Sequence, residues 1–189
     1  MSKRGPLANR AALVTGGGTG IGRATALHLA RRGAHVLITG RRHEPLQEVA
    51  NSTDGIVPLP ADVRDETAVH QLIDAALERW GRLDMLINNA GAFAAAPLAE
   101  ATIQHLAHLH NVNVVAPTLL ARTALPHLSE TRGTIVNVSS TYGHRPTPPG
   151  ASHYGASKAA LEALTRSWAV ELAPTGIRVN AVAPGPTDT

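Results

Sequence analysis

Short apolar runs typical of strands alternate along the chain with longer stretches of helical periodicity. The first run, Ala11 to Thr15, is followed at once by glycine, as expected for a short buried strand. Helical periodicity is clearest from Asp65 to Trp80, where the apolar residues recur at steps of three and one along one face. Six strands are predicted in this way, at residues 11–15, 35–39, 55–59, 84–88, 134–138 and 178–182.

Helices are predicted in the intervals between these strands. Consecutive parallel strands joined by helices form right-handed crossovers, which place helices on both faces of the sheet. The sequence therefore predicts an α/β fold: a doubly wound parallel sheet (Rossmann fold) in three αβα layers, with the strand order 3-2-1-4-5-6. Pro58 places the third strand near an edge. The expected helices cover residues 20–32, 45–50, 65–80, 102–128 with a kink at Pro117, and 154–173.

Length and composition limit the remaining classes. The 189 residues, of which 43% are hydrophobic and 16% charged, fit a single folded domain over residues 1–189. The absence of cysteine excludes a disulfide scaffold, an iron–sulfur cluster and a cysteine nucleophile. There is no apolar run of 18 residues, and basic residues are scattered at a net charge of +3. We expect a soluble, cytoplasmic protein with neither a membrane nor a nucleic-acid partner.

Ten histidines raise the question of a metal site. His105, His108 and His110 are close in sequence, but steps of three and two do not place all three on one helix face. His144 and His153 flank a loop near the candidate site described below, where they could shape a substrate pocket. We expect no metal.

A glycine-rich loop, from Thr15 to Gly22, joins the first strand to the first helix. Glycine permits a tight turn and lets backbone N–H groups approach a phosphate with no Cβ in the way. The spacing, G-x-x-x-G-x-G, differs from the common G-x-G-x-x-G, and a plain turn is the alternative. The strand–turn–helix context favours binding of a nucleotide pyrophosphate.

Tyr154 and Lys158 lie four residues apart at the start of a predicted helix and so share one face. A lysine ammonium beside a phenol favours the phenolate, which makes such a pair a suitable general acid/base. A chance pair on an exposed helix face is the alternative. Ser139 and Ser140 follow the fifth strand, at the carboxyl edge where open parallel sheets place their active sites.

Together these segments resemble the short-chain dehydrogenase/reductase family, in its Tyr-x-x-x-Lys branch. The resemblance runs from about Arg10 to the last residue, with each motif on the expected element. It implies cofactor contacts in the glycine loop and at the ends of later strands, together with a catalytic tetrad. The implied cofactor residues are Gly16, Thr19, Gly20, Ile21, Gly22, Asp62, Val63, Asn89, Ala90, Gly91, Tyr154, Lys158, Pro184, Gly185 and Thr187, and the tetrad is Asn113, Ser140, Tyr154 and Lys158.

The resemblance implies hydride transfer between a nicotinamide ring and a small carbonyl or alcohol substrate. Tyr154 would be the general acid in reduction and the base in oxidation, and Ser140 would hydrogen-bond the substrate oxygen. Lys158 would favour the phenolate and bind the ribose, and Asn113 would hold a water on a proton path. Ser139 or Thr141 could supply the hydroxyl instead, because Ser140 and Tyr154 are 14 residues apart, often one more than in close relatives. The loop 144–150 would absorb the extra residue.

The residues after the second strand bear on the choice between NADP and NAD. An acid there would bind the ribose 2′-hydroxyl and repel a 2′-phosphate. The chain has Gly40, Arg41 and Arg42, with no acid before Glu44. Arg41 can meet a 2′-phosphate with a charge-assisted fork, which favours NADP(H). A solvated arginine pair is the alternative reading, and NAD(H) stays possible.

The end of the chain also departs from the family pattern, as the spacing between Ser140 and Tyr154 does. Family members continue after Pro186 through a substrate-covering loop, a further helix and a seventh strand. We therefore expect a truncated chain without the C-terminal substrate lid, with the sixth strand as an exposed edge. The leading function is an NADP(H)-dependent oxidoreductase. The alternatives are an NAD-dependent dehydrogenase of the same fold and a nucleotide-binding protein without turnover. The family also implies a homodimer or homotetramer.

Overall fold

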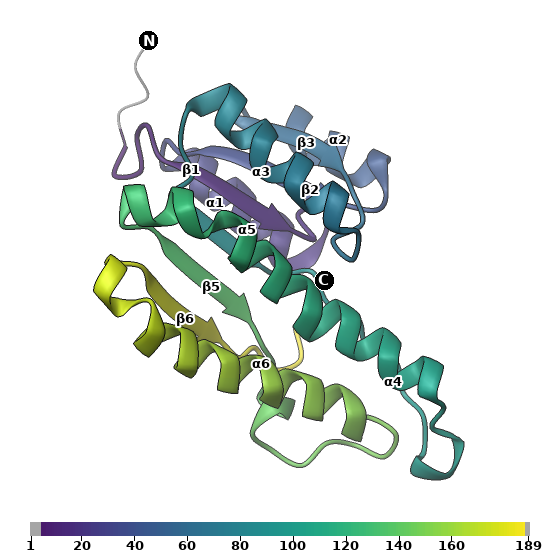
Figure 1. The fold of residues 1–189 in the computed structure, drawn as a ribbon. Helices are drawn as coiled ribbons and strands as arrows, with labels where there is room; N and C mark the ends of the chain where they lie inside the picture. The colour runs from purple at the N-terminus through teal and green to yellow at the C-terminus, as the bar shows by residue number, and fades with distance from the viewer. Residues whose placement is uncertain (1–4, 188–189) are drawn as a thin grey trace.

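Six parallel strands form one sheet in the order β3-β2-β1-β4-β5-β6 (Figure 1). The computed structural model describes residues 5–187. The predicted strand order is confirmed, and within the described residues β3 and β6 are the two edges. The strands are β1 (Ala11–Thr15), β2 (His35–Gly40), β3 (Ile56–Pro60), β4 (Met85–Asn88), β5 (Thr134–Val138) and β6 (Arg178–Val182).

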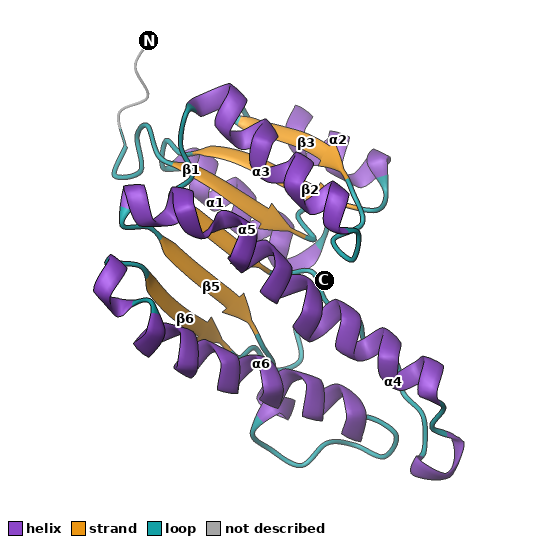
Figure 2. Ribbon diagram, viewed as in Figure 1, coloured by secondary structure: helices purple, strands orange, loops and turns teal. Residues whose placement is uncertain are grey.

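Helices cover both faces of the sheet, which gives the three predicted layers (Figure 2). One core joins α3, α5 and α6 to the sheet, and a second core joins α1 and α2 to its other face. Among residues 5–187, no helix is long and apolar enough to cross a membrane. The helices are α1 (Gly20–Arg31), α2 (His43–Asn51), α3 (Glu66–Trp80), α4 (Ile103–His110), α5 (Ala116–Thr131) and α6 (Ser152–Glu171).

The continuous apolar strands follow from burial on both faces. In β1, Leu13 packs in the core beneath α3 and α5, whereas its neighbours Ala12 and Val14 pack in the core beneath α1 and α2. A strand covered on both sides gains from an apolar residue at every position, so its sequence does not alternate. The sequence pattern and the two cores therefore agree.

The bounds of α3 are set by the residues at its two ends. The Asp65 carboxylate accepts hydrogen bonds from the backbone N–H groups of Thr67 and Ala68. At the other end Gly81 has φ +66°, the left-handed conformation that stops a helix at low cost. The helix after β2 was predicted less well, because it begins at His43 rather than Pro45.

The long helical stretch predicted over residues 102–128 is present over residues 103–131, but a π-helical turn, not a simple kink at Pro117, interrupts it. The structure has α4, then a π-helical turn over Asn111–Val115, then α5. The Ala116 N–H bonds the carbonyl of Asn111, five residues back. Pro117 has no N–H with which to continue the regular α-helical ladder, so the irregularity lies just before it. The π-helical turn places Asn113, a predicted site residue, in the protein interior.

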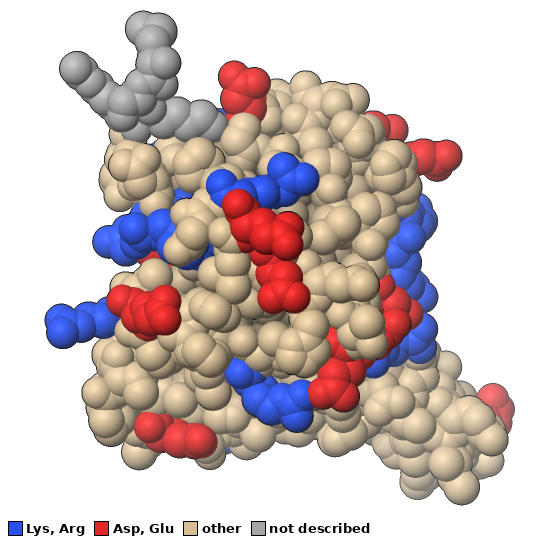
Figure 3. Space-filling view, turned by 45° about the horizontal axis from the view of Figure 1, so that its top comes forward, with Lys and Arg blue, Asp and Glu red and all other residues tan. Residues whose placement is uncertain are grey.

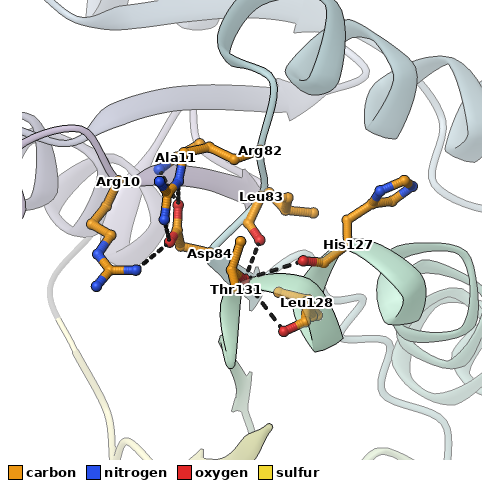
Figure 4. A network of polar contacts seen from close by, with 8 residues as sticks. All are labelled: Arg10, Ala11, Arg82, Leu83, Asp84, His127, Leu128 and Thr131. Carbon is orange, nitrogen blue, oxygen red and sulfur yellow. Dashed lines mark hydrogen bonds and ion pairs between the residues drawn. The ribbon is translucent and has the colours of Figure 1, made fainter. Parts of the chain in front are cut away.

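A polar cluster closes the amino ends of the central strands (Figure 4). The buried Asp84 carboxylate, next to β4, accepts from Arg10 at 2.6 Å, from Arg82 at 2.6 and 2.8 Å and from the Ala11 N–H at 2.8 Å. Burial alone raises the pKa of this carboxyl, but the hydrogen bonds from Arg82, Ala11 and Arg10 outweigh burial and hold the pKa below its usual value. Nearby, the Thr131 hydroxyl donates to the Leu83 carbonyl and ties α5 to the same place.

The lowered pKa of Asp84 gives a sign for the dependence of stability on pH. The ionised carboxylate stabilises the fold at pH values above its unfolded pKa of about 4, and this contribution is lost as the pH falls through the lower folded value. We expect Asp84→Asn to lower the free energy of unfolding by about 1–3 kcal/mol at pH 7, and by progressively less as the pH falls below about 4. Urea denaturation measures both, with Asp74→Asn on the exposed face of α3 as the control. A pH-independent loss would contradict the assignment.

Candidate active site

A cleft of about 560 Å³ opens at the carboxyl ends of β1, β2, β3 and β4. Its walls come from the glycine loop, from the segments that follow β2, β3 and β4, and from His108 and Val112. Ten of the predicted cofactor residues line it, namely Gly16, Thr19, Gly20, Ile21, Arg41, Asp62, Val63, Asn89, Ala90 and Gly91. The predicted residues Gly22, Tyr154, Lys158, Pro184, Gly185 and Thr187 are not part of this lining.

The glycine loop presents the N-terminus of α1 to the cleft. Gly16 and Gly20 have φ values of +64° and +53°, which other residues adopt only at a cost. The N-cap, Thr19, makes no side-chain capping bond, and the first turn of α1 holds no acidic residue. Backbone N–H groups at this helix end are therefore available to an anion, and the helix dipole favours a negative charge there.

Gly22 lies behind the loop and lets α1 pack closely against it. A Cβ at this position would lie 2.2 Å from the Gly16 carbonyl oxygen and 2.4 Å from Asn89 Nδ2. The same Asn89 Nδ2 donates to the carbonyls of Thr15 and Gly16, and the Thr15 hydroxyl accepts from the N–H groups of Asn89 and Ala90. The end of β4 thus holds the shape of the loop, and Gly22 serves packing rather than direct contact with the cleft.

Asn113 is fully buried and joins two elements of the site. Its Oδ1 accepts from the Ala92 N–H at 2.8 Å, and its Nδ2 donates to the Ala92 carbonyl and to Ser157 Oγ, both at 2.9 Å. Ser157 Oγ in turn donates to the Tyr154 carbonyl at 2.7 Å. The segment after β4 is therefore tied to the first turns of α6. Sequence reasoning missed Ser157, whose only signal is its place between Tyr154 and Lys158.

Lys158 is buried beneath this connection, with 4% of its surface exposed. Its Nζ donates to the Val138 carbonyl at 2.8 Å and lies 5.9 Å from the centre of the Tyr154 ring. A Cβ at Gly91 would lie 3.3 Å from this Nζ and 3.4 Å from Asn113 Oδ1, so the ammonium sits directly behind the cleft wall. Burial lowers the pKa of Lys158 to about 8.

The three candidate hydroxyls after β5 differ in their partners. Ser139 Oγ donates to Glu162 Oε1 at 2.8 Å and is thereby committed to α6. Ser140 Oγ accepts from the Tyr142 N–H at 3.3 Å, which leaves its proton for another acceptor. The Thr141 N–H bonds the Pro184 carbonyl, so the segment after β6 lies beside this turn. These contacts favour Ser140 among the three.

Aromatic rings surround Tyr154. The Phe93 ring meets it edge-on at 5.0 Å and the Tyr142 ring at 6.4 Å, measured between ring centres. Phe93 also lines the cleft, so the phenol ring lies between the cleft and the turn that carries Ser140. A 3₁₀ turn, Thr141–Gly143, and the loop that follows accommodate the 14-residue separation between Ser140 and Tyr154.

Several cleft residues were not found from the sequence. Arg64 follows β3, and only its place near a strand end could have indicated it. His108 and Val112 reach the cleft from α4 and the π-helical turn, and no local motif marks them. Of the histidines considered for a metal, His105 and His153 form an edge-on ring pair at 6.2 Å. Within residues 5–187, no three His, Cys, Asp or Glu side chains gather as a metal site.

The buried Lys158 predicts an unusual pH dependence of stability. Between pH 8 and 10.5 the unfolded chain binds a proton at Lys158 that the folded chain has released, so this residue makes the fold more stable as pH rises. Lys158→Met lacks that gain. We expect its stability relative to the unsubstituted protein to fall by about 3 kcal/mol between pH 8 and 10.5 in urea titrations. Arg166→Met, exposed on the same helix, is the control. Parallel curves for the Lys158 variant and the unsubstituted protein would be inconsistent with a depressed pKa.

Comparisons with known proteins agree with this geometry. The model of a family described as short chain dehydrogenase matches residues 10–189. An uncharacterized oxidoreductase of Staphylococcus aureus is 36% identical over 186 residues, which cover 97% of this chain and 80% of that protein.

Two solved structures show the same fold with a cofactor. The crystal structure of a short chain dehydrogenase from Burkholderia cenocepacia in complex with NADP has a TM-score of 0.92 at 41% identity, covering 97% of this chain and 76% of that one. A 3-ketoacyl-(acyl-carrier-protein) reductase from Brucella melitensis complexed with NADH has a TM-score of 0.89 at 33% identity, covering 93% and 75%. With its six-stranded parallel sheet and glycine loop, the chain belongs to the short-chain dehydrogenase/reductase family of oxidoreductases, which have an NAD(P)-binding Rossmann fold.

Proposed function

We propose that the protein is an NADP(H)-dependent oxidoreductase that interconverts a small carbonyl compound and the corresponding alcohol, with Tyr154 as the general acid/base. The observation that carries the proposal is the position of the Lys158 ammonium. It is buried, lies 5.9 Å from the Tyr154 ring centre and sits directly behind Gly91 in the cleft wall. Burying an ammonium costs folding free energy, so its position beside a phenol and a cleft favours a catalytic role.

The cleft residues fit a dinucleotide. The uncapped N-terminus of α1 and the positive φ angles of Gly16 and Gly20 suit a pyrophosphate held by backbone N–H groups. When bound, the nicotinamide cofactor supplies or accepts the hydride. We assign its binding to the ten cleft residues predicted from the sequence, and to Tyr154, Lys158, Pro184, Gly185 and Thr187 toward the nicotinamide side.

The site's own side chains would handle the proton. In reduction the Tyr154 hydroxyl gives its proton to the substrate oxygen, and in oxidation the phenolate takes one back. The Ser140 hydroxyl, whose proton is uncommitted, donates a hydrogen bond to the same oxygen. The Lys158 ammonium places a positive charge 5.9 Å from the centre of the Tyr154 ring, beside the group that transfers the proton.

Asn113 is assigned first to positioning, because its carboxamide is occupied by Ala92 and Ser157. Through these two residues it fixes the cleft wall relative to the turn of α6 that carries Tyr154. The water-holding role implied by the family resemblance stays a prediction, and the second lone pair of Oδ1 is one acceptor that such a water could use.

Charge in the cleft favours NADP(H) over NAD(H). Its lining includes Arg41, Arg42 and Arg64 against a single acidic residue, Asp62. Arg41 and Arg42 follow β2, where an NAD-specific site would place an acid that binds the ribose hydroxyls. An extra phosphate therefore meets a net positive wall. The NAD-dependent dehydrogenase is the alternative, and the two solved relatives hold NADP and NADH respectively.

We also infer that the chain forms a homodimer or homotetramer. Leu98 and Ile103, at the start of the projecting α4 region, are 80% and 81% exposed. Leu106 in α4 and Val115 in the π-helical turn are each 38% exposed. Large exposed apolar side chains close together are typical of protein interfaces. In Figure 3 basic and acidic side chains lie in several interleaved groups over the body of the molecule, whereas the projecting region at the lower right is almost entirely uncharged.

Tyr154→Phe tests the proposed chemistry. The phenyl ring keeps its contacts with Phe93 and Tyr142 but has no proton to transfer. We expect the turnover of a carbonyl substrate with NADPH to fall about 10²–10⁴-fold, with little change in the dissociation constant of NADPH. NADPH absorbance measures turnover, and protein fluorescence measures binding.

Tyr142→Phe is the matched control, because it also removes a phenol hydroxyl. The Tyr142 ring centre lies 6.4 Å from that of Tyr154, and this variant should leave turnover nearly unchanged. Undiminished turnover of the Tyr154 variant would refute the assignment. If the unsubstituted chain binds NADPH but reduces no member of an aldehyde and ketone panel, the nucleotide-binding protein without turnover becomes the better description.

A further inference from the structure

Asp62, the acidic residue of the cleft lining, forms an ion pair with the neighbouring Arg64. Arg64 Nε lies 3.0 and 3.1 Å from the two carboxylate oxygens of Asp62, and Arg64 Nη2 lies 2.5 Å from Oδ2. The Arg64 N–H also donates to Asp62 Oδ1 at 3.0 Å. Both residues line the cleft, and the side chains stay partly exposed, at 33% for Asp62 and 43% for Arg64. This two-pronged pairing orients the guanidinium on the carboxylate.

Sheet register brings this ion pair next to the Arg41 turn. Gly40 pairs with Pro60 across β2 and β3, and the Ala61 N–H donates to the Gly40 carbonyl at 3.0 Å. Arg41 and Asp62 therefore follow the ends of two adjacent strands, β2 and β3. The hydrogen bond from Arg64 is the main cause that lowers the pKa of Asp62 to about 2, and the charge of Arg41 adds to it. Asp62 is thus fully ionised at neutral pH, and its field overlaps that of Arg41.

An anionic ligand in this part of the cleft is attracted by Arg41 and repelled by Asp62. A phosphate drawn to Arg41 also meets the Asp62 carboxylate, and like charges in a partly shielded cleft repel each other. The guanidinium of Arg64 neutralises the Asp62 carboxylate and so removes this repulsion. Arg64 is not one of the residues that the family resemblance assigns to cofactor binding.

We propose that Arg64 is a specificity-determining residue for the cofactor: by neutralising Asp62, it lets the Arg41 side of the cleft accept the 2′-phosphate of NADP(H). The inference rests on the proposed function. It assigns to Arg64 a differential effect, because the 2′-phosphate is present in NADPH and absent from NADH. If Arg64 only held the turn before α3 in shape, its removal would instead weaken the binding of NADPH and NADH equally.

Arg64→Gln tests the proposal by exposing the Asp62 charge. Dissociation constants are measured for NADPH and NADH by fluorescence, and for 2′,5′-ADP and 5′-AMP by calorimetry, at low salt. We expect the preference for the 2′-phosphorylated ligand to fall about tenfold in both pairs, and the deficit to shrink at 0.5 M salt. The double variant Asp62→Asn/Arg64→Gln removes both charges, and we expect it to regain the original preference to within about threefold.

Two further variants separate the possible failures. Arg79→Gln removes the same charge at the far end of α3, outside the cleft, and should leave the preference unchanged. Arg41→Gln removes the cation assigned to the 2′-phosphate and should lower the preference strongly. If Arg41→Gln does so but Arg64→Gln weakens NADPH and NADH equally, the role of Arg64 is overturned while the proposed cofactor stands. If the unsubstituted protein prefers NADH and Arg41→Gln changes nothing, the cofactor assignment itself fails.

Circular dichroism melts accompany every variant. A folded Arg64→Gln protein whose preference for 2′,5′-ADP over 5′-AMP equals that of the unsubstituted chain overturns the proposal. So does a double variant that stays as defective as Arg64→Gln, because the proposed defect is the exposed Asp62 charge.

Discussion

The Asn113 carboxamide holds together the two halves of the site. On one side it pairs with both backbone polar groups of Ala92, beside the cleft, and on the other it bonds Ser157 in α6. The helix that carries Tyr154 is also bonded to β5 and the residue after it, through Lys158 with the Val138 carbonyl, Ser139 with Glu162 and Asn137 with Thr165, but the Asn113 bridge links it to the segment that follows β4. A buried carboxamide left without partners costs more free energy than the hydrogen bonds contribute, so the bridge is strongly held.

The same region carries an energetic cost, because a charged amine is buried there. Lys158 is buried with one backbone carbonyl as its hydrogen-bond acceptor, and its lowered pKa records the cost of keeping an ammonium away from water. Elsewhere the charges are well matched, as at Asp84, where three donors surround one carboxylate at the opposite end of the strands. The amino edge of the sheet thus holds a buried carboxylate with several donors, whereas the carboxyl edge, where the cleft lies, holds a buried ammonium that donates to one backbone carbonyl. This division is common in enzymes, whose sites trade stability for reactivity.

Local sequence signals were enough for most of the framework. The strands were predictable because burial on both faces requires unbroken apolar runs, and α3 was predictable because Asp65 and Gly81 act on the helix next to them. The glycine loop and the Tyr154–Lys158 pair were equally visible, since each motif depends on close spacing. These features have in common that their causes lie within a few residues.

The remainder depends on contacts between distant segments. The π-helical turn was missed because helical periodicity continues through it, and its main partner, Ala92, is 21 residues away from Asn113. The roles of Ser157 and Arg64 could not be predicted, because each depends on a distant segment that folding brings close: Asn113 for Ser157 and the Arg41 turn for Arg64. Pairing between β2 and β3 creates the second of these meetings, and neither strand's sequence indicates which charges will share the cleft.

The most direct measurement follows the hydride itself. The unsubstituted chain is supplied with NADPH deuterated at either face of C4 and with a panel of aldehydes and ketones, and the alcohols are examined by mass spectrometry and NMR. We predict that deuterium reaches the carbinol carbon from one of the two labelled cofactors and not from the other, because a fixed site exposes one face of the ring. Saturable NADPH binding with no deuterium in any alcohol from either label would contradict the assignment of this protein as a carbonyl reductase.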